Sequence, residues 1–205
     1  MKTDKIVSII AVALALAEVL LVLVSWLLSA TMTGGVRSLL SSEGVRWFFG
    51  QFTAVIATPY LVWLLLAAMA IGSLRQSGVA DMVCWKRTPA DSRQGYRHQV
   101  AVMTTLAALI IYIGVIVALT AVPHAVLLSA TGQLMPSAFS RALVPIVAFG
   151  LLLLSAVYGL MAGRFTSVAD VVRSMTTGIA DAAPLLLLYM LAAQLYTSLR
   201  FVFSF

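Results

Sequence analysis

Four polar side chains fall inside long apolar stretches of this sequence, where their chemistry would matter most. Glu18 interrupts the run Ile6–Ala30, while Tyr158, Asp181 and Gln194 lie in two later runs. An ionisable residue in such a run is costly and usually faces a polar interior, so Glu18 could relay protons or cations. The alternative is a protonated or hydroxyl-bonded glutamate that holds two helices together. Both interpretations stay open at this point.

The other three polar groups have simpler interpretations. Gln194 and Tyr158 can hydrogen-bond a neighbouring helix, which is structural as readily as it is a contact to substrate. Asp181 is predicted to stand in the first turn of a helix, where the helix dipole favours a negative charge. We therefore expect intramembrane polar contacts from these three residues, and a coupling role only for Glu18.

Composition places the chain among multi-pass α-helical membrane proteins. Of its 205 residues, 62% are hydrophobic and only 10% are charged, whereas a soluble domain is about half apolar and a quarter charged. The long continuous apolar runs argue against a transmembrane β-barrel, whose strands alternate. A net charge of +6 could suggest nucleic acid, but the basic residues here separate the apolar runs. We therefore expect the lipid bilayer, and no nucleic acid, as a partner.

The apolar pattern predicts one membrane domain over residues 1–205, with about five transmembrane helices. Each run approaches the ~20 residues that a helix needs to cross the hydrocarbon core. An interfacial amphipathic helix, with Trp47 in the aromatic belt, is predicted over residues 36–52. A basic cytoplasmic loop is predicted over 75–99 and an inner turn over 162–175. The predicted spans cover residues 6–30, 54–74, 100–122, 141–161 and 177–199.

Basic residues orient these spans. Nine Lys and Arg residues fall on the side of the N-terminus and four on the other side, which places the N-terminus inside and the C-terminus outside the cell membrane. The single cysteine, Cys84, is interpreted as an ordinary thiol of the cytoplasmic loop. The stretch 125–139, broken by Gly132 and Pro136, is predicted to be a shallow loop on the outer side.

Small residues four apart predict close helix packing. Ala68 and Gly72 form such a pair near the end of the second span, and Gly159 and Gly163 form another at the inner end of the fourth. Catalytic signatures are missing from the spans, which hold no Ser/His/Asp set, no His-Glu-x-x-His motif and no phosphate loop. We expect neither an enzyme nor a bound metal or cofactor.

Two blocks of the sequence resemble one family of transporters. The first is Leu39-Leu-Ser-Ser-Glu-Gly-Val-Arg-Trp-Phe-Phe-Gly-Gln-Phe52, followed by Met69-Ala-Ile-Gly-Ser-Leu-Arg-Gln-Ser-Gly78. The second comprises Ser137–Ile146, Val157–Gly163, Ser167–Met175 and Leu191–Leu195. Both blocks, in this order, are similar to the p-aminobenzoyl-glutamate transporter (AbgT) family.

The resemblance implies a short form of that family. Its members are longer and contain re-entrant hairpins that form the transporting core, whereas this chain has the loop 75–99 in place of the first hairpin and matches the surrounding frame. Residues that bind substrate therefore cannot be carried over.

Two functions remain open. One is transport of a p-aminobenzoyl-glutamate-like or other aromatic-acid anion, exchanged for protons, by an oligomer or as a subunit of a split transporter. The other is a non-transporting scaffold or partner subunit that offers its Ala/Gly seams to a membrane protein. Both functions imply a homo- or hetero-oligomer.

Overall fold

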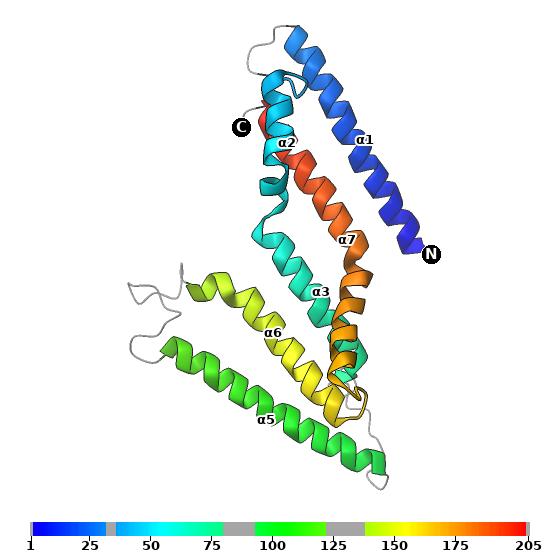
Figure 1. Ribbon diagram of the computed structural model, residues 1–205, viewed down its shortest axis with the longest axis vertical. Helices are drawn as coiled ribbons and strands as arrows, with labels where there is room; N and C mark the ends of the chain where they lie inside the picture. Colours follow the sequence, from blue (N-terminus) through cyan, green and yellow to red (C-terminus); the bar gives the residue numbers. More distant parts are fainter. Residues whose placement is uncertain (1, 32–35, 80–92, 122–137, 204–205) are drawn as a thin grey trace. The chain divides into compact units, whose positions relative to one another are not determined.

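A computed structural model describes residues 2–31, 36–79, 93–121 and 138–203, and every regular element in these ranges is an α-helix (Figure 1). Five of these helices are long and apolar enough to cross a membrane. The predicted fold class, an all-α membrane protein with five spans, is therefore confirmed. Cys84 and most of the stretch 125–139 lie outside the described residues.

The helices divide between two compact units of the chain. One unit comprises Met1–Leu64 and Ala182–Phe205, and the other comprises Leu65–Asp181. Both α3 and α7 therefore contribute residues to each unit. In chain order, the helices are α1 (Lys2–Ala30), α2 (Ser42–Ile56), α3 (Pro59–Ser77), α5 (Arg93–Ala121), α6 (Ala138–Met161) and α7 (Val168–Phe203).

The amphipathic helix and the second span begin later than predicted. In place of 36–52 the structure has α2, which starts after Ser41, whose side chain accepts the N–H of Gly44 at 3.0 Å as an N-cap. In place of a span from residue 54, α3 starts at Pro59. Proline lacks an N–H and disfavours helical backbone at the preceding residue, so the helical structure is interrupted at Ala57 and Thr58. Proline is then well suited to the first helical position.

The turn between α6 and α7 is shorter than the predicted 162–175, because α7 already begins at Val168. The carboxylate of Asp170 accepts the backbone N–H groups of Thr166 and Ser167 at 2.8 and 3.1 Å, and the Thr166 hydroxyl at 2.7 Å. These bonds satisfy donors around the start of a helix, as in a capping box. On the other side of the turn, Gly163 has a φ of 74°, a conformation that commonly ends helices at glycine.

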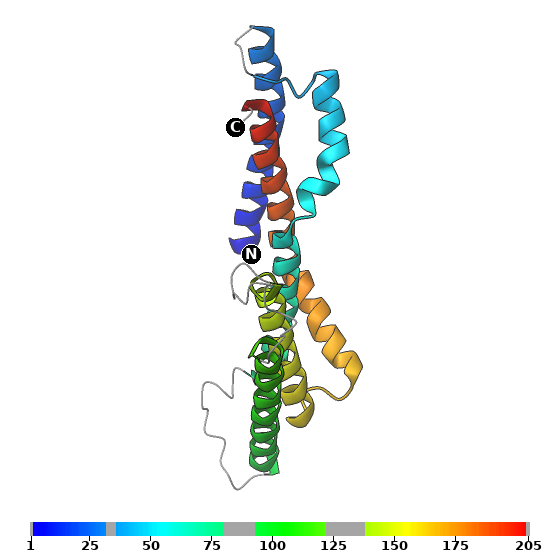
Figure 2. The ribbon, with the colours of Figure 1, turned by 90° about the vertical axis from the view of Figure 1, so that its left-hand side faces the viewer.

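In the first unit, α1 lies beside the C-terminal part of α7 (Figures 1 and 2). Leu21 of α1, Leu39 and Val202 of α7 form a buried apolar cluster. Trp47 of α2 stacks on Phe201 with the ring centroids 4.5 Å apart, which joins α2 to the same end of α7. These contacts position the polar face of α7 against α1.

In the second unit, α5 and α6 lie side by side in both views (Figures 1 and 2). The hydroxyl of Tyr112 on α5 donates to the carbonyl of Ile146 on α6 at 2.6 Å. Gly150 of α6 faces the Tyr112 ring, so closely that a Cβ there would lie 2.7 Å from a ring carbon. One tyrosine therefore both bonds α6 and packs against it.

Also in the second unit, α3 and α7 approach backbone to backbone at two glycines. A Cβ on Gly72 would lie 2.7 Å from the backbone nitrogen of Gly178, and a Cβ on Gly178 would clash with the carbonyl oxygen of Ala68. The predicted pair Ala68 and Gly72 thus lies at this crossing, as expected for small residues at membrane helix interfaces. Gly159 instead faces Phe165 of the following turn, and Gly163 faces Arg97.

The crossing predicts a position-dependent cost for adding one methyl group. Gly178→Ala should lower the free energy of unfolding by roughly 1–3 kcal/mol through overpacking, measured by thermal or denaturant unfolding in detergent. Gly114→Ala is the matched control, because a Cβ at this mid-helix glycine meets nothing within 4 Å. Alanine should there be neutral or stabilising by up to about 1 kcal/mol. Equal destabilisation by both substitutions would contradict the contact.

Candidate intramembrane functional site

Glu18 is bonded to a buried serine on the neighbouring helix of the first unit. The hydroxyl of Ser198 on α7 donates to Oε1 of Glu18 on α1 at 2.5 Å. Ser198 is fully buried and Glu18 is half-buried. A hydroxyl group can donate to a carboxyl oxygen whether or not the carboxyl group is ionised. The acid that the sequence singled out therefore lies at a helix–helix contact.

Gln194 joins the same cluster from one turn earlier on α7. Its amide donates to the Ser198 hydroxyl at 3.5 Å, the long end of the hydrogen-bond range. Two of the three polar side chains keep an acceptor atom that finds no partner within the described part of the chain, namely Oε2 of Glu18 and Oε1 of Gln194. Buried acceptors are costly to leave unpaired. These two oxygens can thus accept further hydrogen bonds, and the Glu18 carboxylate can accept a proton.

Helical spacing explains why these groups meet. On α7, Gln194, Ser198 and Val202 follow one another every four residues and so share one face. On α1, Ser25 lies two turns beyond Glu18 and accepts the N–H of Leu39 at 3.2 Å. The buried face of α1 therefore combines a carboxyl and a hydroxyl group with the apolar cluster.

A second feature of the first unit is a hollow of about 300 Å³ next to the stacked aromatic rings, which we call the aromatic hollow. It joins side chains of α2 and α7, and Arg37 places its guanidinium 5.9 Å from the centre of the Phe201 ring. Charge and aromatic surface therefore meet at one place. Its lining residues are Trp47, Gln51, Val55, Thr197, Arg200 and Phe201.

Sequence reasoning missed the aromatic hollow. It assigned Trp47 to an interfacial belt and did not connect it with Arg200. The usable signal was the spacing of Thr197, Arg200 and Phe201, which places the three on one face of a helix. The spacing of residues along α7 does not indicate which part of α2 packs against that face.

The remaining candidate residues lie in the second unit. Tyr158 is only 3% exposed, and its hydroxyl lies 2.9 Å from Nδ1 of His98. Asp181 lies 4.0 Å from Arg75 in an exposed ion pair. Its predicted place in the first turn is wrong, because α7 begins at Val168 and leaves Asp181 in the helix interior. The dipole of the first turn therefore does not act on it.

Five membrane-length helices within the described part of the chain, one of them with a carboxyl group at a helix contact, define a multi-pass membrane protein. Comparison with known proteins specifies the class. The sequence pattern of the AbgT transporter family matches residues 88–202, more than half of the chain. The chain therefore belongs to the AbgT transporter family. The second block of resemblance noted above lies within this match, and the first block precedes it.

A solved structure has the same fold. The YdaH transporter of Alcanivorax borkumensis, described as having an unusual topology, is similar with a TM-score of 0.78 over 95% of this chain and 71% of that chain. The two are 16% identical in sequence, so the likeness establishes the fold alone. No curated protein matches the chain.

The cluster predicts that Ser198 stabilises the contact between α1 and α7. Ser198→Ala should lower the free energy of unfolding by about 0.6–2 kcal/mol, because a buried carboxyl oxygen loses its donor. Ser8→Ala on the exposed side of α1 is the matched control and should change stability little. A double-mutant cycle with Glu18→Gln measures the coupling directly. A coupling energy of zero would contradict the bond.

Proposed function

We propose that this protein takes part in secondary transport across the cell membrane, with Glu18 as the residue that couples substrate movement to protons. Membership of a transporter family supports a transport-related role. The observation that carries the coupling role is the bond from Ser198 to Glu18, with two further acceptor oxygens beside it. Ionisable groups within a membrane that face a protein interior are typical of proton relays.

The aromatic hollow supports an aromatic-acid anion of the p-aminobenzoyl-glutamate type as the transported substrate. Trp47 and Phe201 offer flat apolar surface, while Arg200 and Gln51 offer charged and polar donors. Half of the lining residues are apolar and half are polar or charged, and polar groups beside apolar surface fix a ligand's orientation in small-molecule sites. Its volume of about 300 Å³ falls at the lower end of the range for such sites.

The proposed assembly is an oligomer, or a complex with a partner membrane subunit, in the inner or plasma membrane. Small residues already serve helix contacts within the chain, at Gly72 and Gly178. A non-transporting scaffold is the competing function, and it differs in one measurable respect. A scaffold forms a stable oligomer but carries no flux.

Uptake by reconstituted protein tests the proposal. Proteoliposomes should accumulate labelled p-aminobenzoyl-glutamate when a pH gradient is imposed. Glu18→Gln should remove at least about nine-tenths of the gradient-dependent part, since an amide side chain does not ionise and so cannot carry the coupled proton. Glu43→Gln is the control, because Glu43 is an exposed carboxyl in the first turn of α2. Undiminished gradient dependence in Glu18→Gln refutes the coupling role.

The outcome for the native chain separates the two functions. Flux from the purified protein excludes a pure scaffold. A complete absence of flux, together with a stable cross-linked oligomer, would favour the scaffold and end the transport proposal for the chain acting alone.

The proposed topology, with the N-terminus inside and the C-terminus outside, has its own test. Cys84 is the chain's only cysteine and belongs to the predicted cytoplasmic loop, outside the described residues. A membrane-impermeant maleimide should therefore label inside-out vesicles at least several-fold more than right-side-out vesicles, since Lys and Arg gather on the cytoplasmic side. Cys84→Ser is the blank. Stronger labelling of right-side-out vesicles would place Cys84 outside and contradict the proposed topology.

A further inference from the structure

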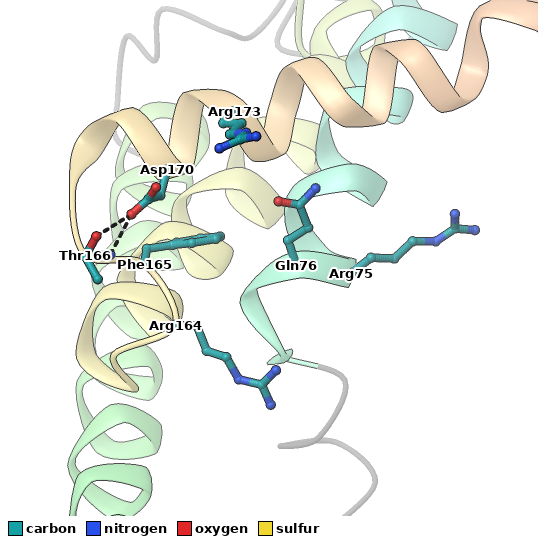
Figure 3. A pocket seen from close by; sticks show the side chains of 7 residues that line it. All are labelled: Arg75, Gln76, Arg164, Phe165, Thr166, Asp170 and Arg173. Atoms are coloured by element: carbon teal, nitrogen blue, oxygen red, sulfur yellow. Dashed lines mark hydrogen bonds between the residues drawn. The ribbon is translucent and has the colours of Figure 1, made fainter.

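Two carboxyl groups of this chain differ in how fully they are bonded. One oxygen of Asp170 accepts three hydrogen bonds, two from Thr166 (Figure 3) and one from the N–H of Ser167. Glu18 accepts one, from Ser198 to Oε1, and its Oε2 finds no partner within the described part of the chain. The turn before α7 thus commits three donors to Asp170, whereas Glu18 keeps an oxygen to which no described donor is committed.

The hydroxyl of Ser198 is used differently from that of its neighbour on α7. Thr197 donates to the backbone carbonyls of Ala193 and Gln194 at 2.9 Å each, as short hydroxyl side chains in helices commonly do. Ser198 instead donates to Glu18 on α1 at 2.5 Å and accepts the amide of Gln194 at 3.5 Å. A serine hydroxyl has one proton to donate and two lone pairs that accept. The groups on its two sides therefore set the direction in which it donates.

Gln194 carries a donor and an acceptor at the end of one side chain. Only 7% of the residue is exposed, and its Oε1 finds no partner among the described residues. Rotation about the terminal torsion exchanges the oxygen and the NH2 group, and this torsion has broad, roughly two-fold preferences. The amide can therefore present either a donor or an acceptor to the Ser198 hydroxyl.

We propose that Gln194 is a positioning residue that keeps Ser198 bonded to Glu18 in both protonation states of the carboxyl group. With Glu18 ionised, the Gln194 NH2 donates to Ser198 and Ser198 donates to the carboxylate, as in the structure. When the carboxylate takes up a proton from the aqueous phase, the new O–H donates to the Ser198 oxygen. The amide of Gln194 rotates, and the Ser198 hydroxyl then donates to Oε1. The same three side chains thus bond to one another in the opposite direction.

This role rests on the proposed proton coupling and makes it more specific. A coupling residue is loaded and unloaded in each cycle, and a buried polar group that is left unpaired in either state is costly. An amide that rotates lowers this cost in both states. A side chain that only accepts, or only donates, lowers it in one.

The other charged and titratable side chains described in the first unit have different surroundings. Arg200, on the same helix as Gln194, lines the aromatic hollow. Arg37 lies 3.7 Å from Glu43. Tyr189 bonds to Thr58, and the exposed ones are Lys5, Arg46, Tyr60 and Tyr196. The amide and the hydroxyl are themselves uncharged, so the protonation of Glu18 is the charge change to which the amide responds.

Infrared difference spectra of the purified full-length protein in nanodiscs, acid minus alkaline, test the rotation. The native chain should show the C=O stretch of a protonated carboxyl group, which Glu18→Gln removes, and a side-chain amide band, which Gln194→Met removes. Methionine is flexible and lacks both ends of the amide, so it fills the site without the hydrogen bonds. The melting transition shows that each variant is folded. Gln99→Met is the matched control, because Gln99 is exposed on α5 in the second unit, and it should keep both bands.

Uptake into proteoliposomes supplies a second readout. Gln194→Met should lower the maximal rate of gradient-driven uptake at least about fivefold and change KM less than about twofold, because it impairs the cycling of Glu18 and not substrate binding. The aromatic hollow is lined by other residues of α7, namely Thr197, Arg200 and Phe201. Gln99→Met should change neither value. A normal maximal rate in Gln194→Met, or an equal loss in Gln99→Met, would contradict the role of Gln194.

The role of Gln194 and the proposed function fail in different ways. Identical difference spectra from the native chain and Gln194→Met would overturn the role of Gln194, even where Glu18 couples transport. Both bands without any flux would end the transport proposal for the chain acting alone and leave the reversible bonds in place. If Glu18→Gln removes no carboxyl band, Glu18 does not take up a proton in this range, and both proposals are wrong.

Discussion

The hydrocarbon core of a membrane offers no hydrogen-bond partners, and this constraint decides where the polar groups of this chain lie. Short hydroxyl side chains satisfy it locally by donating to a carbonyl one turn earlier. Longer side chains satisfy it between helices: Tyr112 reaches Ile146, and Glu18 receives the Ser198 hydroxyl. The side chains that bond locally include Thr104, Thr105, Thr120, Ser155, Thr177 and Thr197.

The same constraint explains which parts of the molecule could be predicted from the sequence. Composition and run length were sufficient for an all-α protein with five spans, since only helices of this length satisfy the backbone within lipid. Helix ends were less accessible, because they depend on single capping contacts. The second span was predicted from residue 54, although α3 starts at Pro59, and the inner turn was predicted to reach residue 175, although α7 starts at Val168 with Asp170 in its first turn. In both cases local backbone chemistry overrode the apolar pattern.

The candidate site shows a different limit. Glu18 and Gln194 stood out because each is polar within an apolar run, but Ser198, which joins them, is an ordinary residue of membrane helices. Pairing between residues 180 positions apart depends on how helices pack, and periodicity within one helix contains no such information.

The glycine crossing of α3 and α7 has a consequence for how this part of the protein responds to its surroundings. Gly72 and Gly178 meet through backbone atoms, without any titratable or hydrogen-bonding side chain at the closest point. Shape holds the closest point of this joint, and the ion pair between the same two helices, Arg75 with Asp181, is exposed and contributes little. A helix contact made by a carboxyl group, in contrast, can respond to pH. We therefore expect pH and salt to act on the contact of α3 with α7 less than on the contact of Glu18 with Ser198.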